Sequence, residues 1–391
     1  MTRSADRKIS PLALALWIGF FSLPGQAQEI LSPEDFQIEL SGYLQELGMH
    51  SDDFFGQSLD LSQTRVRLTF DFDFSRGVSG EFSQTLQGES GSAFFNPVFQ
   101  LSREIETPTY FDWDSEVEDQ DDHRLDWSVY RAWLKYENEK LSLTAGRQRI
   151  ALGTAYFFSP MDIFNPVSPL ALESEERVGV DGAGLELALN ENTYLTFAYG
   201  IGDVIGESKF AADFKTTIQS YDLSLLSARL LEDWVIAAGF SGYLKNGSLY
   251  GEAAYTFPEA GDQFLRTIVG YQYSWKNSII LTAEYFYNEG IFTEEMLTNP
   301  ALLAANQDPL VTIGKNFLCL SIGFDLNPLL RFNAAAIYEL DHGSFFVGPG
   351  LSYSASNNLT LAAGAQMLNG SDQGDFGIMP GLVWAKVRWD F

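Results

Sequence analysis

The alternation of apolar and polar residues constrains the fold of this chain more than any other feature of its sequence. It is clearest from Val66 to Phe74, Val-Arg-Leu-Thr-Phe-Asp-Phe-Asp-Phe, where every second residue is apolar. Successive side chains of a β-strand point to opposite faces, so a period of two predicts a strand with one apolar and one polar face. Seventeen segments between Phe36 and Phe391 show this period, with little helical pattern between them. The chain is therefore expected to be all-β.

The connections between these segments are short and long in rough alternation through much of the chain. Short ones carry turn residues, as in Asn190-Glu-Asn192 and Lys245-Asn-Gly247. Outer-membrane β-barrels have this arrangement because their periplasmic turns are short and their external loops are long. The long connections are Phe94–Arg124, Ala151–Arg177, Asp203–Thr217 and Gly290–Lys315.

The strand count has to be even if both ends of a bacterial barrel lie in the periplasm. Seventeen is therefore one strand too many or one too few. Strand directions counted from the two ends of the chain disagree between Leu231 and Asn277. We expect a transmembrane antiparallel up-and-down β-barrel of about sixteen strands, with eighteen as the alternative. A barrel of that size leaves a water-filled interior unless a part of the chain fills it.

The first residues have the pattern of an export signal. Basic residues precede an apolar run from Ile9 to Leu23, and Gly25-Gln-Ala27 offers small residues for cleavage. We expect residues 1–27 to be a cleaved signal peptide and residues 28–391 to form one barrel domain in a Gram-negative outer membrane. After the signal, no stretch approaches the roughly 20 apolar residues of a membrane helix. The aromatic content of 14% suits a chain that meets lipid through strands.

The net charge of −28 argues against nucleic acid as a partner. Much of the acid lies in the segment Asp112–Asp122, which we interpret as a solvated external loop. Divalent-cation bridging to lipopolysaccharide, or a calcium site, is the alternative for this segment. The single cysteine, Cys319, excludes an internal disulfide and is expected to be a packing residue. No residue pattern singles out a cofactor or a resident metal.

The segment Leu141–Arg177 contains the longest structured-looking interruption of the strand pattern. It begins as a short alternating strand and continues into Ala151–Pro166, which is rich in aromatic residues and proline, before the acidic Glu173-Ser-Glu-Glu176. A long loop of this composition needs a reason to exist inside an array of short strands. In a large barrel, the usual reason is that the loop folds into the interior and narrows it. We therefore predict an in-folded constriction loop.

Side chains on the polar phase of the strands are expected to line the pore. This phase carries basic residues, namely Arg65, Arg67, Arg131, Lys135, Lys386 and Arg388. Arg147 is on the lipid phase by strict alternation, where an arginine at mid-depth costs about 2–4 kcal/mol. We therefore expect a bulge at Gly146 that turns Arg147 toward the pore, or an early end of the strand.

The constriction loop faces this basic wall with acidic residues, which are Asp162, Glu173, Glu175 and Glu176. One interpretation is that acid and base on opposite sides of a narrow pore discriminate solutes by charge. The other is that they form internal ion pairs that merely solvate the interior. Both interpretations remain open.

The C-terminus resembles the assembly signal of outer-membrane proteins. Apolar residues alternate with polar ones up to an aromatic last residue, with Val387, Trp389 and Phe391 as the last three apolar positions. This resemblance implies recognition by the barrel-assembly machinery. The segment from Gly146 through Phe158 to Pro166 is similar to one in uncharacterised porin-like and alginate-export-like barrels of Gram-negative bacteria. That similarity implies a channel and names no substrate.

The sequence thus favours an outer-membrane channel for small hydrophilic solutes, anions among them. A plugged structural or adhesive barrel is the main alternative. An outer-membrane enzyme is a further one, but Asp121-Asp-His123 lacks the second acidic or Asp-His pair that an outer-membrane protease would need. We therefore expect no catalytic activity. Expected partners are outer-membrane lipid, lipopolysaccharide and the transported solutes, and the oligomeric state is left open.

Overall fold

The computed structural model describes residues 28–31, 36–52, 56–74, 76–96, 99, 109–165, 168–173, 176–177, 179–202, 208–230, 232–259, 261–276, 278–292, 310–377 and 379–391. The expected signal peptide, residues 1–27, lies outside this range, as does Glu175. Within it, no helix is long and apolar enough to cross a membrane.

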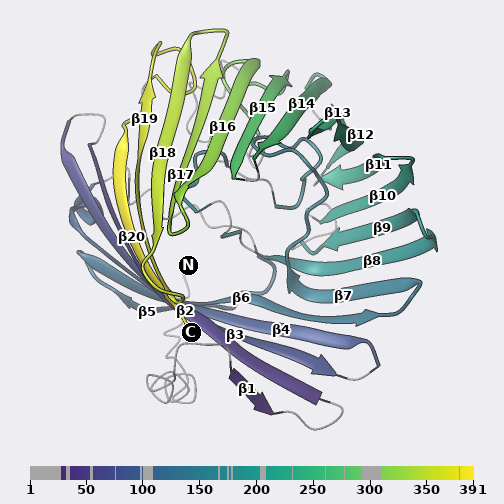
Figure 1. Cartoon of the computed structure of the whole chain (residues 1–391), viewed down its shortest axis with the longest axis horizontal. Coiled ribbons are helices and arrows are strands. Elements are labelled where there is room, and N and C mark those ends of the chain that lie inside the picture. The colour runs from purple at the N-terminus through teal and green to yellow at the C-terminus, as the bar shows by residue number, and fades with distance from the viewer. Residues whose placement is uncertain are drawn as a thin grey trace, which may run out of the picture.

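The described residues form a closed antiparallel barrel of 18 strands (Figure 1). Each strand pairs with the next, and β2 pairs with β20 to close the ring. The barrel strands are β2 (Phe36–Asp52), β3 (Ser58–Phe74), β4 (Val78–Ser90), β6 (His123–Glu137), β7 (Leu141–Gln148), β8 (Val180–Asn190), β9 (Thr193–Gly200), β10 (Lys209–Ile218), β11 (Tyr221–Leu230), β12 (Asp233–Leu244), β13 (Gly247–Phe257), β14 (Phe264–Trp275), β15 (Ile279–Asn288), β16 (Asn316–Asn327), β17 (Leu330–Glu339), β18 (Ser344–Ser354), β19 (Leu359–Asn369) and β20 (Leu382–Asp390).

The predicted fold class is confirmed. The barrel has eighteen strands, which was the alternative to the expected sixteen. The strand missing from the sequence count is β10, which lies in the segment assigned above to a long connection, Asp203–Thr217. Its outward side carries Phe210 and Phe214, and its inward side carries Asp213 and Lys215. The phenylalanines keep the alternating pattern of a strand, but the charged residues made this segment resemble a loop. The strands between Leu231 and Asn277, where the directions seemed to conflict, are those expected from the sequence.

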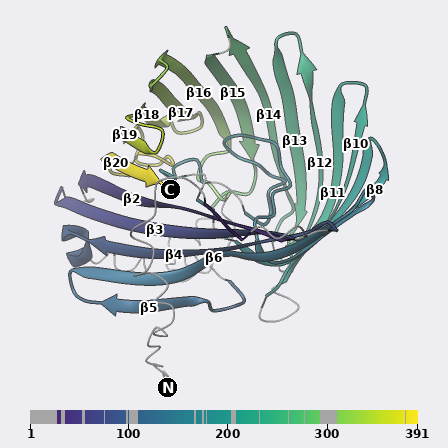
Figure 2. The same cartoon turned by 60° about the horizontal axis from the view of Figure 1, so that its bottom comes forward.

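Two short strands lie outside the ring. β1 (Gln28–Leu31) pairs with the first part of β2, and β5 (Asp114–Asp119) pairs with the first part of β6, where β7 does not reach. Figure 2 shows β5 beside β6 on the side of the barrel where β2 to β6 extend. The acidic segment expected to be a loop is thus partly a strand. Among the described residues, no group of three or more His, Cys, Asp or Glu side chains is placed to hold a metal ion.

The two faces of the wall differ as the alternating pattern predicts. On β15, Tyr285 is 41% exposed on the outer side, whereas its neighbour Phe286 is fully buried on the inner side. On β16, Leu318 is exposed outside and Phe317 and Cys319 are fully buried inside. The outer surface is therefore apolar and suited to lipid, whereas the buried apolar residues inside the barrel need a cover from within.

The last strand closes the barrel beyond its final side-chain pair. The backbone N–H and C=O of Phe391 both bond to Gly42 on β2, at 2.9 Å each. A Cβ at Gly42 would lie 2.9 Å from the Phe391 ring and 2.4 Å from the carbonyl oxygen of Arg67. Only glycine therefore fits here without displacing its neighbours, and the C-terminal residue is part of the closing seam.

Candidate pore constriction

The segment after β7 runs inside the ring of strands (Figure 1), as expected for a constriction loop. Its first part, residues 150–164, carries seven apolar side chains that are each less than 10% exposed: Ile150, Leu152, Phe157, Phe158, Met161, Ile163 and Phe164. We call this part the anchored arm. The second described part, residues 168–173 and 176–177, is here called the polar arm.

One half of the anchored arm packs on small apolar residues of β9 to β13. Ile150, Leu152, Met161, Ile163 and Phe164 share one buried cluster with wall residues, which are Ala198, Ala211, Leu226, Ala228, Val235, Ala237 and Ala254. The alanines leave room for the loop against the strands. At about 25 cal/mol per Å² of apolar area removed from water, these contacts favour a loop held inside the barrel.

The tip of the anchored arm packs on aromatic residues of the next strands. Phe158 stacks on Phe286 of β15, with ring centroids 4.6 Å apart and an interplanar angle of 11°, and also contacts Phe317 of β16. Phe157 belongs to the same buried cluster, which reaches Phe376 in the connection after β19. The arm therefore follows the inner wall from β9 to β18.

Two buried glutamates of the wall bind the backbone of the anchored arm. Glu252 on β13 accepts hydrogen bonds from the N–H groups of Ala155, at 2.9 Å, and Met161, at 3.1 Å. Glu284 on β15 accepts from the N–H groups of Tyr156, at 2.6 Å, and Phe157, at 3.0 Å. A loop inside a barrel has no strand partner for its N–H groups, and these carboxylates provide acceptors for them.

Asp162, one of the predicted pore-lining acids, lies at the end of the anchored arm and is 5% exposed. Its Oδ2 is 2.8 Å from Nη1 of Arg177, and its Oδ1 has no hydrogen-bond partner. Burial raises the pKa of the Asp162 carboxyl to about 6, although Arg177 opposes the shift. Asp162 thus ties the two arms of the loop to each other and does not reach the arginines of β3.

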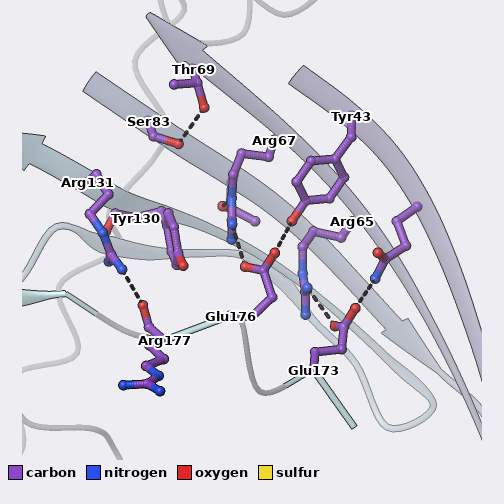
Figure 3. Close-up of polar contacts among 12 residues, drawn as sticks. Tyr43, Arg65, Arg67, Thr69, Ser83, Tyr130, Arg131, Glu173, Glu176 and Arg177 are labelled. Atoms are coloured by element: carbon purple, nitrogen blue, oxygen red, sulfur yellow. Dashed lines mark hydrogen bonds and ion pairs between the residues drawn. The ribbon is translucent and has the colours of Figure 1, made fainter. Parts of the chain in front are cut away.

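The polar arm begins beside the aromatic cluster, where Leu170 packs and its carbonyl accepts from Gln366 of β19 at 2.7 Å. Its two described glutamates, Glu173 and Glu176, lie against side chains of β2 and β3 (Figure 3). Glu173 accepts from Nη1 of Arg65 at 2.7 Å, from Nε2 of Gln45 at 2.8 Å and from Nζ of Lys386 at 3.2 Å. Burial alone would raise the pKa of Glu173, but Arg65 and Lys386 hold it below its usual range. Glu173 therefore binds as an ionised carboxylate.

Glu176 makes the matching contacts two residues along β2 and β3. It pairs with Nη1 of Arg67 and accepts from the hydroxyl of Tyr43 at 3.0 Å. The Arg67 guanidinium also lies over the ring of Tyr130, 3.4 Å from its centroid. Both arginines are 8% exposed and point to the interior. The structure thus brings Arg65, Arg67, Glu173 and Glu176 together.

Two other predicted residues lie on the same inner wall without joining this group. Arg131 is 7% exposed and donates to the backbone carbonyls of Tyr130, at 2.8 Å, and Arg177, at 2.7 Å. A register shift between β4 and β6 next to it turns both Tyr130 and Arg131 inward. Lys135 is paired with Glu137 near the turn between β6 and β7, away from the loop.

Arg147 is placed differently from the expectation. The register of β7 is continuous through Gly146, so the expected bulge is absent, and the strand ends early, at Gln148. Arg147 is 2% exposed and pairs with Asp181 of β8 at 2.8 Å, while its Nη1 bonds to the carbonyl of Val129. Arg147 is the last residue but one of β7, and its side chain reaches the carbonyls of Val129 and Phe111, where it is buried and does not line the interior.

Several residues of this site were not predicted. Tyr43 and Gln45 occupy alternate positions on the inward phase of β2, which is the signal that could have found them. Glu252 and Glu284 also lie on inward phases, but their partners are about a hundred residues away in sequence. Arg149 is exposed at the end of β7, where the loop begins.

Comparisons with known proteins identify relatives of the fold only. No family model matches the sequence, and no curated protein matches it. Among solved structures, OccAB4 of Acinetobacter baumannii superimposes with a TM-score of 0.59 at 12% identity, covering 94% of this chain and 100% of that one. OccD3 (OpdP) of Pseudomonas aeruginosa gives 0.56 at 12% identity, with 94% of both chains covered. The outer membrane protein OprD of P. aeruginosa gives 0.52 at 12% identity, covering 94% and 95%. This chain thus has the fold of these Occ and OprD barrels.

Proposed function

We propose that this protein is an outer-membrane channel through which small hydrophilic solutes diffuse, with a preference for anions. The observation that carries the proposal is the row of buried arginines on the inner wall of β3 and β6, Arg65, Arg67 and Arg131, facing an in-folded loop. A lipid-facing exterior and a charged interior are what a water-filled pore requires.

The loop supplies the selectivity in this proposal. An 18-strand barrel without a loop inside would have a wide interior that distinguishes solutes poorly. With its anchored arm on β9 to β18 and its polar arm on β2, β3 and β20, the loop narrows that interior from within. In a narrow, poorly screened gap, the charge of the wall acts strongly on a passing ion.

The location follows from the same features. Residues 1–27 are proposed to direct export, and Val387, Trp389 and Phe391 to be recognised by the barrel-assembly machinery. OprD, one of the barrels that share this fold, is an outer membrane protein, which supports this location. Outer-membrane lipid and lipopolysaccharide would then surround the barrel. Its structural relatives are barrels of this kind, in keeping with a protein that is not an enzyme.

The test is ion selectivity in planar bilayers across a salt gradient. Replacing Arg65, Arg67 and Arg131 with glutamine should shift the reversal potential toward cation selectivity. The matched control replaces the same number of basic residues in periplasmic turns, Lys140, Lys245 and Lys276, and should leave the potential unchanged. Equal shifts in both variants would contradict a selective role for the buried arginines. A wild-type barrel without conductance would favour the plugged structural barrel instead.

A further inference from the structure

The anion-binding groups of the proposed pore are already occupied by carboxylates of the protein itself. Glu173 accepts hydrogen bonds from Arg65, Lys386 and Gln45. Glu176 pairs with Arg67 and accepts from the hydroxyl of Tyr43. Each glutamate makes the contacts that a carboxylate of a solute would make on the same wall (Figure 3). Two of the three buried arginines, Arg65 and Arg67, are thus paired with carboxylates of the protein, whereas Arg131 donates to backbone carbonyls.

The two arms of the loop are held in different ways. The anchored arm has seven buried apolar side chains and two buried carboxylates that accept its backbone N–H groups. From Ala171 to Arg177, the described residues of the polar arm meet the wall through polar groups, at Glu173, Glu176 and Arg177. A competing anion therefore acts on the contacts of the polar arm while the rest of the loop stays in place.

We propose that Glu173 and Glu176 determine the specificity of the pore by acting as internal competitors, which a solute with two negative groups displaces from Arg65 and Arg67. This inference rests on the proposed channel function. The solute enters as the two glutamates leave the arginines, so no covalent step is involved. Each buried arginine keeps a carboxylate partner throughout the exchange, and neither is left unpaired in the wall.

The spacing of the arginines selects the class of solute. Arg65 and Arg67 are alternate residues of β3, so their Cα atoms are about 6.7 Å apart along the strand. Their side chains both point inward, and each holds a different glutamate. A short dicarboxylate can engage both arginines at once, whereas a monocarboxylate replaces one glutamate and leaves the other in place. The competition therefore favours dianions over monoanions.

The glutamates are accessible enough for this exchange. The side chains of Glu173 and Glu176 are 13% and 19% exposed, and those of Arg65 and Arg67 are 10% exposed. Each pair is thus largely shielded, which strengthens its attraction, yet still open on one side.

The experiment measures binding of glutarate, and of acetate as the single-charge probe, to the purified full-length barrel in detergent by titration calorimetry. The variant E173Q/E176Q removes both competing charges and keeps side-chain length. Its glutarate Kd is expected to fall about tenfold relative to wild type, with a smaller change for acetate. The control E139Q/E191Q removes two charges from periplasmic turns and should leave both Kd values unchanged.

An equal glutarate Kd in wild type and E173Q/E176Q, with both barrels folded by circular dichroism and heat-shifted migration, would overturn the proposal. An equal change in E139Q/E191Q would also overturn it, because the effect would then come from net charge alone. The conservative variant E173D/E176D should keep a Kd near that of wild type, since its carboxylates still compete. Binding is measured in detergent, without a bilayer, so this experiment does not depend on conductance. An absence of conductance would refute the channel function, whereas the Kd values alone test whether the glutamates compete with the solute.

Discussion

Replacing Glu252 by glutamine is expected to loosen the anchored arm without unfolding the barrel. The Glu252 carboxylate is 4% exposed and accepts from the N–H groups of Thr154, Ala155 and Met161 and from the hydroxyls of Thr154 and Ser159. A glutamine amide keeps one oxygen and turns an NH₂ group toward the other donors. The hydroxyls of Thr154 and Ser159 can rotate to accept from that group, but at least one backbone N–H loses its acceptor. With a buried unsatisfied donor costing about 1–3 kcal/mol, the arm is destabilised by about 1–3 kcal/mol.

Amide hydrogen exchange measured by mass spectrometry reports this change directly. Exchange from a locally opened state scales with the opening equilibrium, so a loss of about 1–3 kcal/mol corresponds to roughly 5-fold to 150-fold faster exchange. Peptides covering residues 154–161 should accelerate in E252Q, whereas peptides from β17 should not. The matched control E191Q, in a periplasmic turn, should change neither. Unchanged protection of residues 154–161 would refute the reasoning, because apolar packing alone would then hold the arm.

Three further outcomes are expected. Shortening the loop Ala151–Glu176 should raise single-channel conductance, and an unchanged value would mean that the loop does not limit the pore. Deleting Phe391 should leave the barrel unassembled in the periplasm, since its backbone closes the seam with Gly42 at 2.9 Å; normal outer-membrane yield would contradict this role. Because the pKa of Glu173 is lowered, its pairing with Arg65 is complete above the usual carboxyl range and is lost as the pH falls through the lowered value. In a D162N background, which removes the loop carboxyl whose pKa is raised to about 6, anion selectivity should therefore be constant from neutral pH to about pH 5 and rise below about pH 4, and a rise already near pH 6 in that background would contradict the pairing.

The fold was predictable because alternation is a local signal that each strand repeats. The strand prediction failed at β10, where three charged residues, Lys209, Asp213 and Lys215, occupy one strand of ten residues. The outward phase, with Phe210 and Phe214 about 40% exposed, kept the pattern. In a barrel, the lipid-facing phase is thus the more dependable of the two, because lipid restricts it to apolar residues while the interior accepts charge.

The arginines of the site were predictable only where the register is regular. Arg65 and Arg67 follow the inward phase of β3 and are found there. Alternation assigns each residue either to the lipid side or to the interior, and Arg147 is in neither place. β7 is short, so the space between β6 and β8 past its end is free for the Arg147 side chain. There its guanidinium satisfies the carbonyl of Val129 and the carboxylate of Asp181. Predicting this would have required knowing that β7 stops before β6 does.

The sequence of the strands contains a pattern that indicates where the anchored arm packs. Inward positions of a water-filled barrel are expected to be polar, yet consecutive strands carry Ala211, Ala228, Ala237 and Ala254 on that phase, each no more than 2% exposed. Small apolar residues on the inward phase of adjacent strands predict that another segment of the protein packs over them. If they faced water instead, polar side chains would be favoured at these positions. An inward glutamate beside such a patch, as at Glu252, then has to find donors in whatever covers it. Since the strands use their own N–H groups in the ladder, the donors must come from an irregular segment, and the long loop after β7 is the segment that supplies them.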